Sequence, residues 1–221
     1  NKINIVAPIF IIPHGNYLPF ISKSRTQKKA KEYFKISPNK KVLLFFGMIK
    51  KVKGLEILLK AFKNVVKKNN DIMLIVAGKV WKNDFSLYQS IIDKNNLNEY
   101  CIIHNRFIAQ ENVSLYYNIA DLVVLPYKKI YQSGVMLMAM SYDVPVLASD
   151  LPPIKEMIDD EVNGFLFASE DTDALSNKLN EILLKPKLLE SVKISANKLI
   201  QQKHCWNTIG AQTKSAYESI Q

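Results

Sequence analysis

The sequence predicts an α/β fold in which helices cover both faces of a doubly wound parallel sheet. Short apolar runs alternate with amphipathic helical segments along the chain, which is the pattern of repeated strand–helix units around a parallel sheet. Several runs are apolar at every position, as strands buried on both faces are. The hydrophobic share, 48% of 221 residues, allows a core large enough for such a domain.

The first strand–helix unit begins at the apolar run 42–46, which Gly47 ends. Leucine, phenylalanine and valine then recur at helical spacing over residues 55–66. Further strands are expected, in chain order, at 72–76, 101–103, 122–125, 144–148 and 164–167. Further helices are expected at 85–95, after Gln110, after Ser133, at 171–184 and at 187–202. Right-handed crossovers place the ligand site of such a sheet at the carboxyl ends of its strands.

The composition limits the classes of partner and site. Lys and Arg number 30 against 20 Asp and Glu, and the net charge of +10 suits an anionic ligand, an acidic membrane surface or a nucleic acid. Cys101 and Cys205 are far apart, so neither a zinc site nor a disulfide framework is supported. The sequence has no signal-peptide pattern and does not begin with Met, and we expect a cytoplasmic piece of a longer protein.

A turn before an unusually apolar helix is the strongest local signal. Ser133 can cap this helix, and Gly134 lets a ligand oxygen approach the main chain. The unpaired N–H groups and the positive end of the helix dipole suit a phosphate. A capped core helix without a ligand fits the same pattern. The absence of G-x-G-x-x-G and G-x-x-x-x-G-K-[ST] argues against a dinucleotide-binding dehydrogenase and a P-loop ATPase.

Two lysines flank the start of the helix that follows the first strand. Lys50 and Lys53 would hold a pyrophosphate together with the helix dipole. Charge-assisted hydrogen bonds of this kind are worth roughly 1.5 to 3 kcal/mol each when shielded from water. The alternative is that both are ordinary solvated lysines of a loop in a lysine-rich protein.

Six segments, in this order, resemble the carboxy-terminal half of a family 4 glycosyltransferase. They are FGMIKKVKG at 46–54, AGKVW at 77–81, HNRFI at 104–108, ADLVVLPY at 120–127, QSGV at 132–135 and PVLASD at 145–150. Each is weak alone, but the ordered set is specific, and the resemblance covers residues 11–221. It implies a GT-B enzyme, in which two Rossmann-like domains face each other across a cleft and the carboxy-terminal one binds a nucleotide-diphosphate sugar.

The resemblance also implies a division of the chain. Residues 1–36 would be the interdomain linker and an N-terminal extension, and residues 37–203 would be the Rossmann-like, nucleotide-sugar-binding domain. Residues 204–221 would be a C-terminal helix that crosses back to the first domain of the whole enzyme. That first domain, which would hold the acceptor, is not in the sequence, so we expect little transfer activity from this part alone.

The resemblance assigns roles to individual residues. Lys50 and Lys53 match the basic pair that neutralises the diphosphate leaving group, with Lys50 standing where arginine is more usual. The other implied residues are Gly47, Gly78, Lys79, Ser133, Gly134 and Val135 for the donor phosphates, Arg106, Phe107 and Ile108 for the base, and Gln132 and Glu156 as further candidates. Transfer would retain the anomeric configuration and need neither a metal ion nor a cofactor.

One departure from the family pattern concerns two glutamates that many members carry with seven residues between them. Their positions hold Ile130 and Met138 here, and the branch with Gln-Ser-Gly-Val tends to lack them too. The loss leaves open a non-catalytic module that binds sugar nucleotides.

The expected partners are a sugar-nucleotide donor and, through the missing domain, a saccharide or lipid-linked acceptor. We expect at most peripheral contact with the inner face of a membrane. A nucleic-acid-binding domain is the less favoured alternative, because the lysines flank separate helices.

Overall fold

The computed structural model describes residues 8–22, 26–82 and 84–220. At its centre is a six-stranded sheet in the order β3-β2-β1-β4-β5-β6, and every neighbouring pair runs parallel. The strands are β1 (Lys41–Phe46), β2 (Ile72–Ala77), β3 (Cys101–His104), β4 (Leu122–Leu125), β5 (Val146–Ser149) and β6 (Phe165–Phe167). The predicted doubly wound α/β fold is therefore confirmed.

Strand β5 begins two residues later than the expected range 144–148. The Val144 N–H bonds to the Ala139 carbonyl at 2.9 Å, at the end of the preceding helix. Pro145 has no N–H to donate, although its carbonyl accepts from Val123 at 2.9 Å. Ladder pairing on the N–H side therefore starts at Val146.

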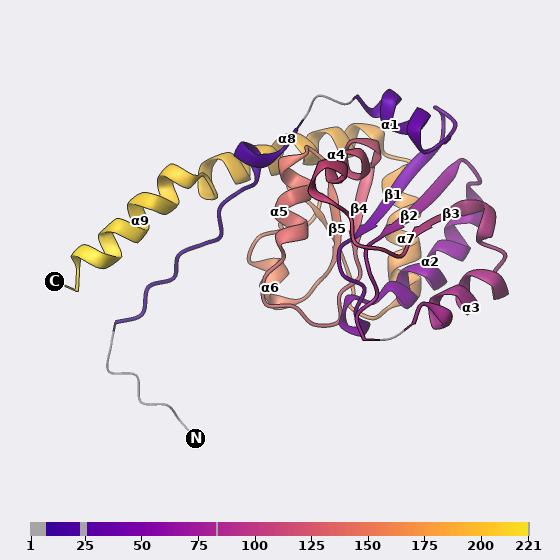
Figure 1. Ribbon diagram of the computed structural model, residues 1–221, viewed down its shortest axis with the longest axis horizontal. Helices are drawn as coiled ribbons and strands as arrows, with labels where there is room; N and C mark the ends of the chain where they lie inside the picture. Colours follow the sequence, from indigo (N-terminus) through magenta and orange to yellow (C-terminus); the bar gives the residue numbers. More distant parts are fainter. Residues whose placement is uncertain (1–7, 23–25, 83, 221) are drawn as a thin grey trace, which may run out of the picture.

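Helices cover both faces of the sheet (Figure 1). They are α1 (Gln27–Tyr33), α2 (Leu55–Lys68), α3 (Ser86–Lys94), α4 (Gln110–Ile119), α5 (Gly134–Ser141), α6 (Pro152–Lys155), α7 (Thr172–Leu183), α8 (Pro186–Lys203) and α9 (Trp206–Glu218). Alternate β1 residues belong to separate core clusters: Leu44 packs in the cluster with α1, α4 and α5, and Leu43 packs in the cluster with α2, α3 and α7. The two clusters are the two sides of one buried sheet.

Helix α1 lies within the segment expected as a linker. Gln27 Nε2 donates to the Ile119 carbonyl at 3.2 Å, which attaches α1 to the end of α4. The Lys31 ammonium is bonded to the carbonyls of Pro38 and Lys40 at 2.6 and 2.8 Å. Residues 1–7 and 23–25 of the expected linker, and residue 221, lie outside the described residues. The boundaries at 36 and 203 stay predictions.

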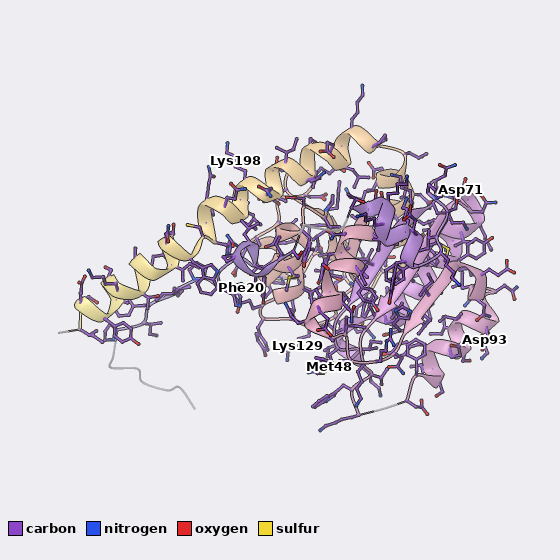
Figure 2. All side chains as sticks on the ribbon, turned by 45° about the horizontal axis from the view of Figure 1, so that its top comes forward. Phe20, Met48, Asp71, Asp93, Lys129 and Lys198 are labelled. Carbon is purple, nitrogen blue, oxygen red and sulfur yellow. The ribbon has the colours of Figure 1, made fainter. Side chains whose placement is uncertain are left out.

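Helix α9 projects from the body of the domain, and residues 8–15 extend on the same side (Figure 1). The buried Asn16 joins the two: its N–H donates to the His204 carbonyl at 2.7 Å, and its carbonyl accepts from Trp206 Nε1 at 2.9 Å. Phe20, at the base of α9 in Figure 2, contacts Trp206 edge to face. None of the helices in the described residues is both long and apolar enough to cross a bilayer.

Candidate functional site

The strand order reverses between β1 and β4, and the two loops that leave these strands go to opposite faces. The chain after β1 leads to α2 on one face, and the chain after β4 leads to α5 on the other. Such a reversal favours a ligand-binding crevice outside the carboxyl ends of the strands. The two loops there, residues 47–54 after β1 and 126–133 after β4, are called the crevice loops.

Two predicted glycines bring the loops after β1 and β2 into direct backbone contact. A Cβ on Gly78 would lie 1.9 Å from the Gly47 carbonyl oxygen, and both residues have positive φ, 150° and 98°. On its other side Gly47 faces α5, where a Cβ would lie 3.3 Å from Val135 Cγ2. Gly47, Gly78 and Val135 are thus neighbours. The glycines permit the close packing of the backbone here.

Main-chain and ionic contacts join the loops after β1 and β4. The Lys128 N–H donates to the Val52 carbonyl at 2.9 Å, and the Lys128 ammonium forms an ion pair with Glu56 in the first turn of α2. Residues Lys51–Lys53 form a single 3-10 turn that ends at Gly54. These contacts fix the backbone position of Lys53.

The side chain of Lys53 contacts an aromatic residue of the loop after β4. Its ammonium lies 3.6 Å from the centroid of the Tyr127 ring. Burial, and next the charge of Lys50, lower the pKa of Lys53 from 10.5 to about 8. Lys50 itself is exposed, and its ammonium lies 5.1 Å from the ring centroid of Trp81. Each lysine of the predicted basic pair therefore lies against an aromatic ring, and a role of the pair in phosphate binding stays a prediction.

The turn before α5 has the predicted cap. Ser133 is buried, and its Oγ accepts from the Met136 N–H at 3.2 Å. No hydrogen-bond partner for the N–H groups of Gly134 and Val135 is found within residues 8–22, 26–82 and 84–220. Both residues are only partly buried. Two donors and the positive end of a helix dipole thus remain for a ligand.

Tyr127 connects the lysine to this turn. Its hydroxyl is buried next to that of Ser133, at a geometry short of a hydrogen bond. Burial raises the pKa of the phenol, which stays neutral. Sequence reasoning assigned Tyr127 no role, because an aromatic after a buried strand is typical of a core. Two features of the sequence could have indicated a role for Tyr127. It lies in the same loop as Ser133, and that loop follows a strand next to the one that precedes Lys53.

The predicted base-binding residues form a separate hollow after β3. Arg106, Phe107 and Ile108 line a space of about 240 Å³ together with Tyr33 and residues of α4. The Phe107 side chain is 80% exposed, and the Arg106 N–H bonds to the His104 carbonyl at 2.8 Å. Strand β3 is two strands from β1 in the sheet. A role in base binding stays a prediction.

Gln132 and Glu156 lie in another hollow, of about 530 Å³, beside the start of α5. Ser133 and Ile130 line it too. Met138 packs with Ile130 against the core cluster of α5, so apolar packing occupies the positions of the two family glutamates. Lys79 is exposed, and its carbonyl accepts from the Ile49 N–H at 3.0 Å. No described contact brings its side chain to the α5 turn.

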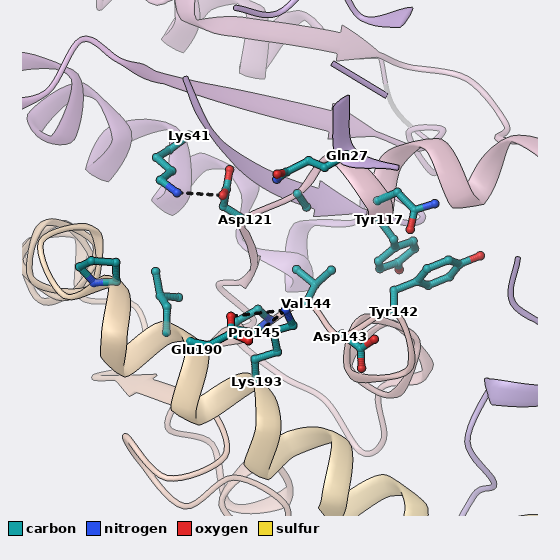
Figure 3. A pocket seen from close by; sticks show the side chains of 14 residues that line it. Gln27, Lys41, Tyr117, Asp121, Tyr142, Asp143, Val144, Pro145, Glu190 and Lys193 are labelled. Atoms are coloured by element: carbon teal, nitrogen blue, oxygen red, sulfur yellow. Dashed lines mark hydrogen bonds and ion pairs between the residues drawn. The ribbon is translucent and has the colours of Figure 1, made fainter. Parts of the chain in front are cut away.

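A hollow of about 510 Å³ lies at the opposite, amino-terminal edge of the sheet (Figure 3). Four of its charged side chains form pairs, Lys41 with Asp121 at 3.1 Å and Lys193 with Glu190 at 3.3 Å, and a fifth, Asp143, accepts a hydrogen bond from Asn197. None of the site residues predicted from the sequence lines it. Among the described residues, no three His, Cys, Asp or Glu side chains gather as ligands for a metal ion.

The chain is similar to known proteins along most of its length. The model of the family described as "Glycosyl transferases group 1" matches residues 26–199. The chain is 27% identical to the lipopolysaccharide 1,2-N-acetylglucosaminetransferase of Salmonella typhimurium over 92% of this chain and 54% of that protein. It is 23% identical to the capsular polysaccharide biosynthesis glycosyltransferase CapM of Staphylococcus aureus, over 87% and 50%. The chain spans about half the length of the curated relatives it matches.

Solved structures share the fold. The HepE protein of Anabaena, described in complex with UDP and glucose, has a TM-score of 0.81 at 20% identity, over 94% of this chain and 56% of that one. The C-terminal domain of the group 1 glycosyl transferase LpcC of Francisella tularensis has a TM-score of 0.74 at 22% identity. That match covers 85% of this chain and 96% of the domain.

Proposed function

The chain belongs to the glycosyl transferases of group 1, and on that premise we propose that it is the donor-binding half of a retaining, metal-independent glycosyltransferase. The observation that carries the proposal is the contact of Lys53 with Tyr127, in the loop that leads to α5. The half-buried ammonium lies 3.6 Å from the centroid of that ring, and the loop ends at the N–H groups of Gly134 and Val135, which have no partner among the described residues. A diphosphate offers the negative charge and the acceptor oxygens that these groups bind.

The relatives support a sugar nucleotide as the source of that diphosphate. The Anabaena protein with the same fold is described with UDP and glucose, and the Salmonella relative is named for transfer of N-acetylglucosamine. We assign the base to the segment of Arg106, Phe107 and Ile108, and the sugar to the hollow of Gln132 and Glu156. Ser133 lines that hollow, so the sugar would lie next to the phosphates bound at the start of α5.

The chemistry follows from the charges. When the bond between the sugar and the diphosphate breaks, the leaving oxygen gains negative charge. The ammonium groups of Lys53 and Lys50 and the amides of Gly134 and Val135 stabilise that charge. They thereby replace the divalent cation that other transferases use for this purpose. The acceptor, a saccharide or a lipid-linked sugar, would be held by the half of the relatives that this chain does not span.

A second candidate is a module that binds a sugar nucleotide without turnover. The observation that favours it is the apolar packing of Ile130 and Met138, which leaves no carboxylate at either position. Both candidates predict donor binding. They differ in the whole protein, where the transferase releases the nucleoside diphosphate with acceptor present and the module does not.

Thermal unfolding with UDP, GDP, ADP and their sugar conjugates tests the proposal. A ligand at roughly a hundred times its dissociation constant stabilises the fold by about 2.7 kcal/mol, which for a chain of this size raises the midpoint by roughly 5 to 10 °C. We expect Lys53→Ala to weaken binding roughly ten- to hundredfold, the loss of one charge-assisted hydrogen bond. Lys60→Ala, at an exposed position of α2, is the control with the same charge change. Equal binding by both variants would contradict the assignment of Lys53.

A further inference from the structure

Tyr127 contacts Lys53 and lies next to the Ser133 cap. Its ring is 1% exposed, so it is fixed by its surroundings. Its carbonyl accepts from Ser169 Oγ at 3.4 Å, which ties its main chain to the segment after β6. The Lys53 ammonium therefore lies against the face of a ring whose position is fixed.

We propose that Tyr127 is a positioning residue for the donor: its ring face holds the Lys53 ammonium against the loop that leads to α5. This inference rests on the proposed function, since it concerns the orientation of the lysine that would bind the diphosphate. It assigns a role in donor binding to a residue that does not itself touch the donor.

The physical advantage of a ring over an acid explains the choice. A lysine side chain has four rotatable bonds, and an ammonium that contacts nothing samples many positions. A carboxylate would fix it but would also cancel its charge and repel the phosphates, whereas an aromatic face attracts the cation and leaves its charge intact. Glu56, the acid in the first turn of α2, is paired with Lys128. No ion pair of Lys53 is found in the described part of the chain.

A role for Tyr127 in core packing alone makes a different prediction. In that case its substitution would lower stability and would weaken donor binding whether or not Lys53 is present. If the ring acts through Lys53, its effect on binding disappears when the ammonium is absent. A double-mutant cycle separates the two, because it isolates the interaction between the two side chains.

The experiment measures by calorimetry the affinity for whichever of UDP, GDP or ADP the wild type binds, in Tyr127→Leu, Lys53→Met and the double variant. We expect Tyr127→Leu to weaken binding about tenfold when Lys53 is present and less than twofold in the Lys53→Met background. Thermal unfolding of the same proteins should show the packing loss in both backgrounds. Tyr127→Phe restores the ring face and should recover the affinity that Tyr127→Leu loses.

A fluorinated ring keeps the proposal testable if the leucine variant does not fold. Tyr127→3,4,5-trifluorophenylalanine preserves the shape of the Phe variant but removes electron density from the ring face, and it should bind the diphosphate several-fold more weakly than Tyr127→Phe. Equal binding by these two variants, or the same loss from Tyr127→Leu in both backgrounds, would overturn the positioning role and leave the proposed function standing. A wild type that binds none of the three nucleotides would overturn both.

Discussion

Gly54 lies directly against Pro126: a Cβ on Gly54 would come 1.8 Å from the Pro126 carbonyl oxygen. Gly54 precedes α2, and Pro126 follows β4. The residues next to them in the chain are Lys53 and Tyr127, and the Lys53 ammonium lies 3.6 Å from the centroid of the Tyr127 ring. The close approach of the two backbones is therefore what brings the lysine onto the ring.

Gly54→Ala should both destabilise the fold and weaken donor binding. The residue has a φ of +64°, which costs a side chain about 1 to 2 kcal/mol, and the clash is with main-chain atoms that have little room to move. We expect a loss of about 2 kcal/mol or more in the free energy of unfolding by urea. Because the backbones must separate, Lys53 moves off Tyr127, and the affinity for the diphosphate should fall as well.

Gly210→Ala is the matched control for that substitution. Gly210 is in α9, and a Cβ there meets nothing within 4 Å. Alanine is the better helix former by about 0.8 to 1 kcal/mol, so this variant should be as stable as the wild type or more so. Unchanged stability of Gly54→Ala would show that the contact of the loops is not tight in solution.

Ser133→Ala should cost about 1 kcal/mol of stability, the usual loss for an N-cap. It should also weaken donor binding, because the first turn of α5 frays and its amides are less well fixed. Asp171→Ala is the control: Asp171 caps α7 through the N–H groups of Asp173 and Ala174, each at 2.9 Å, and no described contact of its side chain reaches the loops at 47–54 and 126–133. Urea unfolding should show similar losses for both, and calorimetry a loss of affinity for Ser133→Ala alone.

Much of the fold was predictable because a parallel sheet has a simple pattern. The run 42–46 is apolar at every position, and alternate residues pack on opposite faces of the sheet. Helix α1 was not predicted, since its sequence QKKAKEY has no apolar period. It forms because Lys31 finds carbonyl partners and Ala30 packs in the core, contacts that only the folded chain provides.

The site was predictable where one turn carries the chemistry and was missed where two loops must meet. Ser133 and Gly134 predict the start of a helix from adjacent residues, and in the structure Ser133 caps that helix. The contact of Lys53 with Tyr127 joins positions 74 residues apart along the sequence, and it depends on the reversal of strand order at β1 and β4. Such a pairing follows from topology, which residue spacing does not encode.

The ammonium of Lys53 should give stability and donor affinity opposite dependences on pH. Its pKa is about 8 in the folded chain and near 10.5 when exposed, because burial and the charge of Lys50 disfavour the protonated form. Between those values the unfolded chain holds a proton that the folded chain has released. The contribution of this group to the free energy of unfolding therefore rises with pH across that window. Affinity goes the other way, because only the charged form attracts a diphosphate.

Calorimetry and thermal unfolding between about pH 7 and 9.5 would measure both trends on the same protein. Above about pH 8 we expect the affinity to fall, approaching tenfold per pH unit. Lys53→Met should bind weakly at every pH and lose both trends, while Lys60→Met, at its exposed position on α2, should keep both. A wild type whose affinity stays constant over this range, beside a weak Lys53→Met variant, would mean that Lys53 binds the donor but keeps its proton. In that case the ring of Tyr127 would stabilise the ammonium more than burial and Lys50 oppose it.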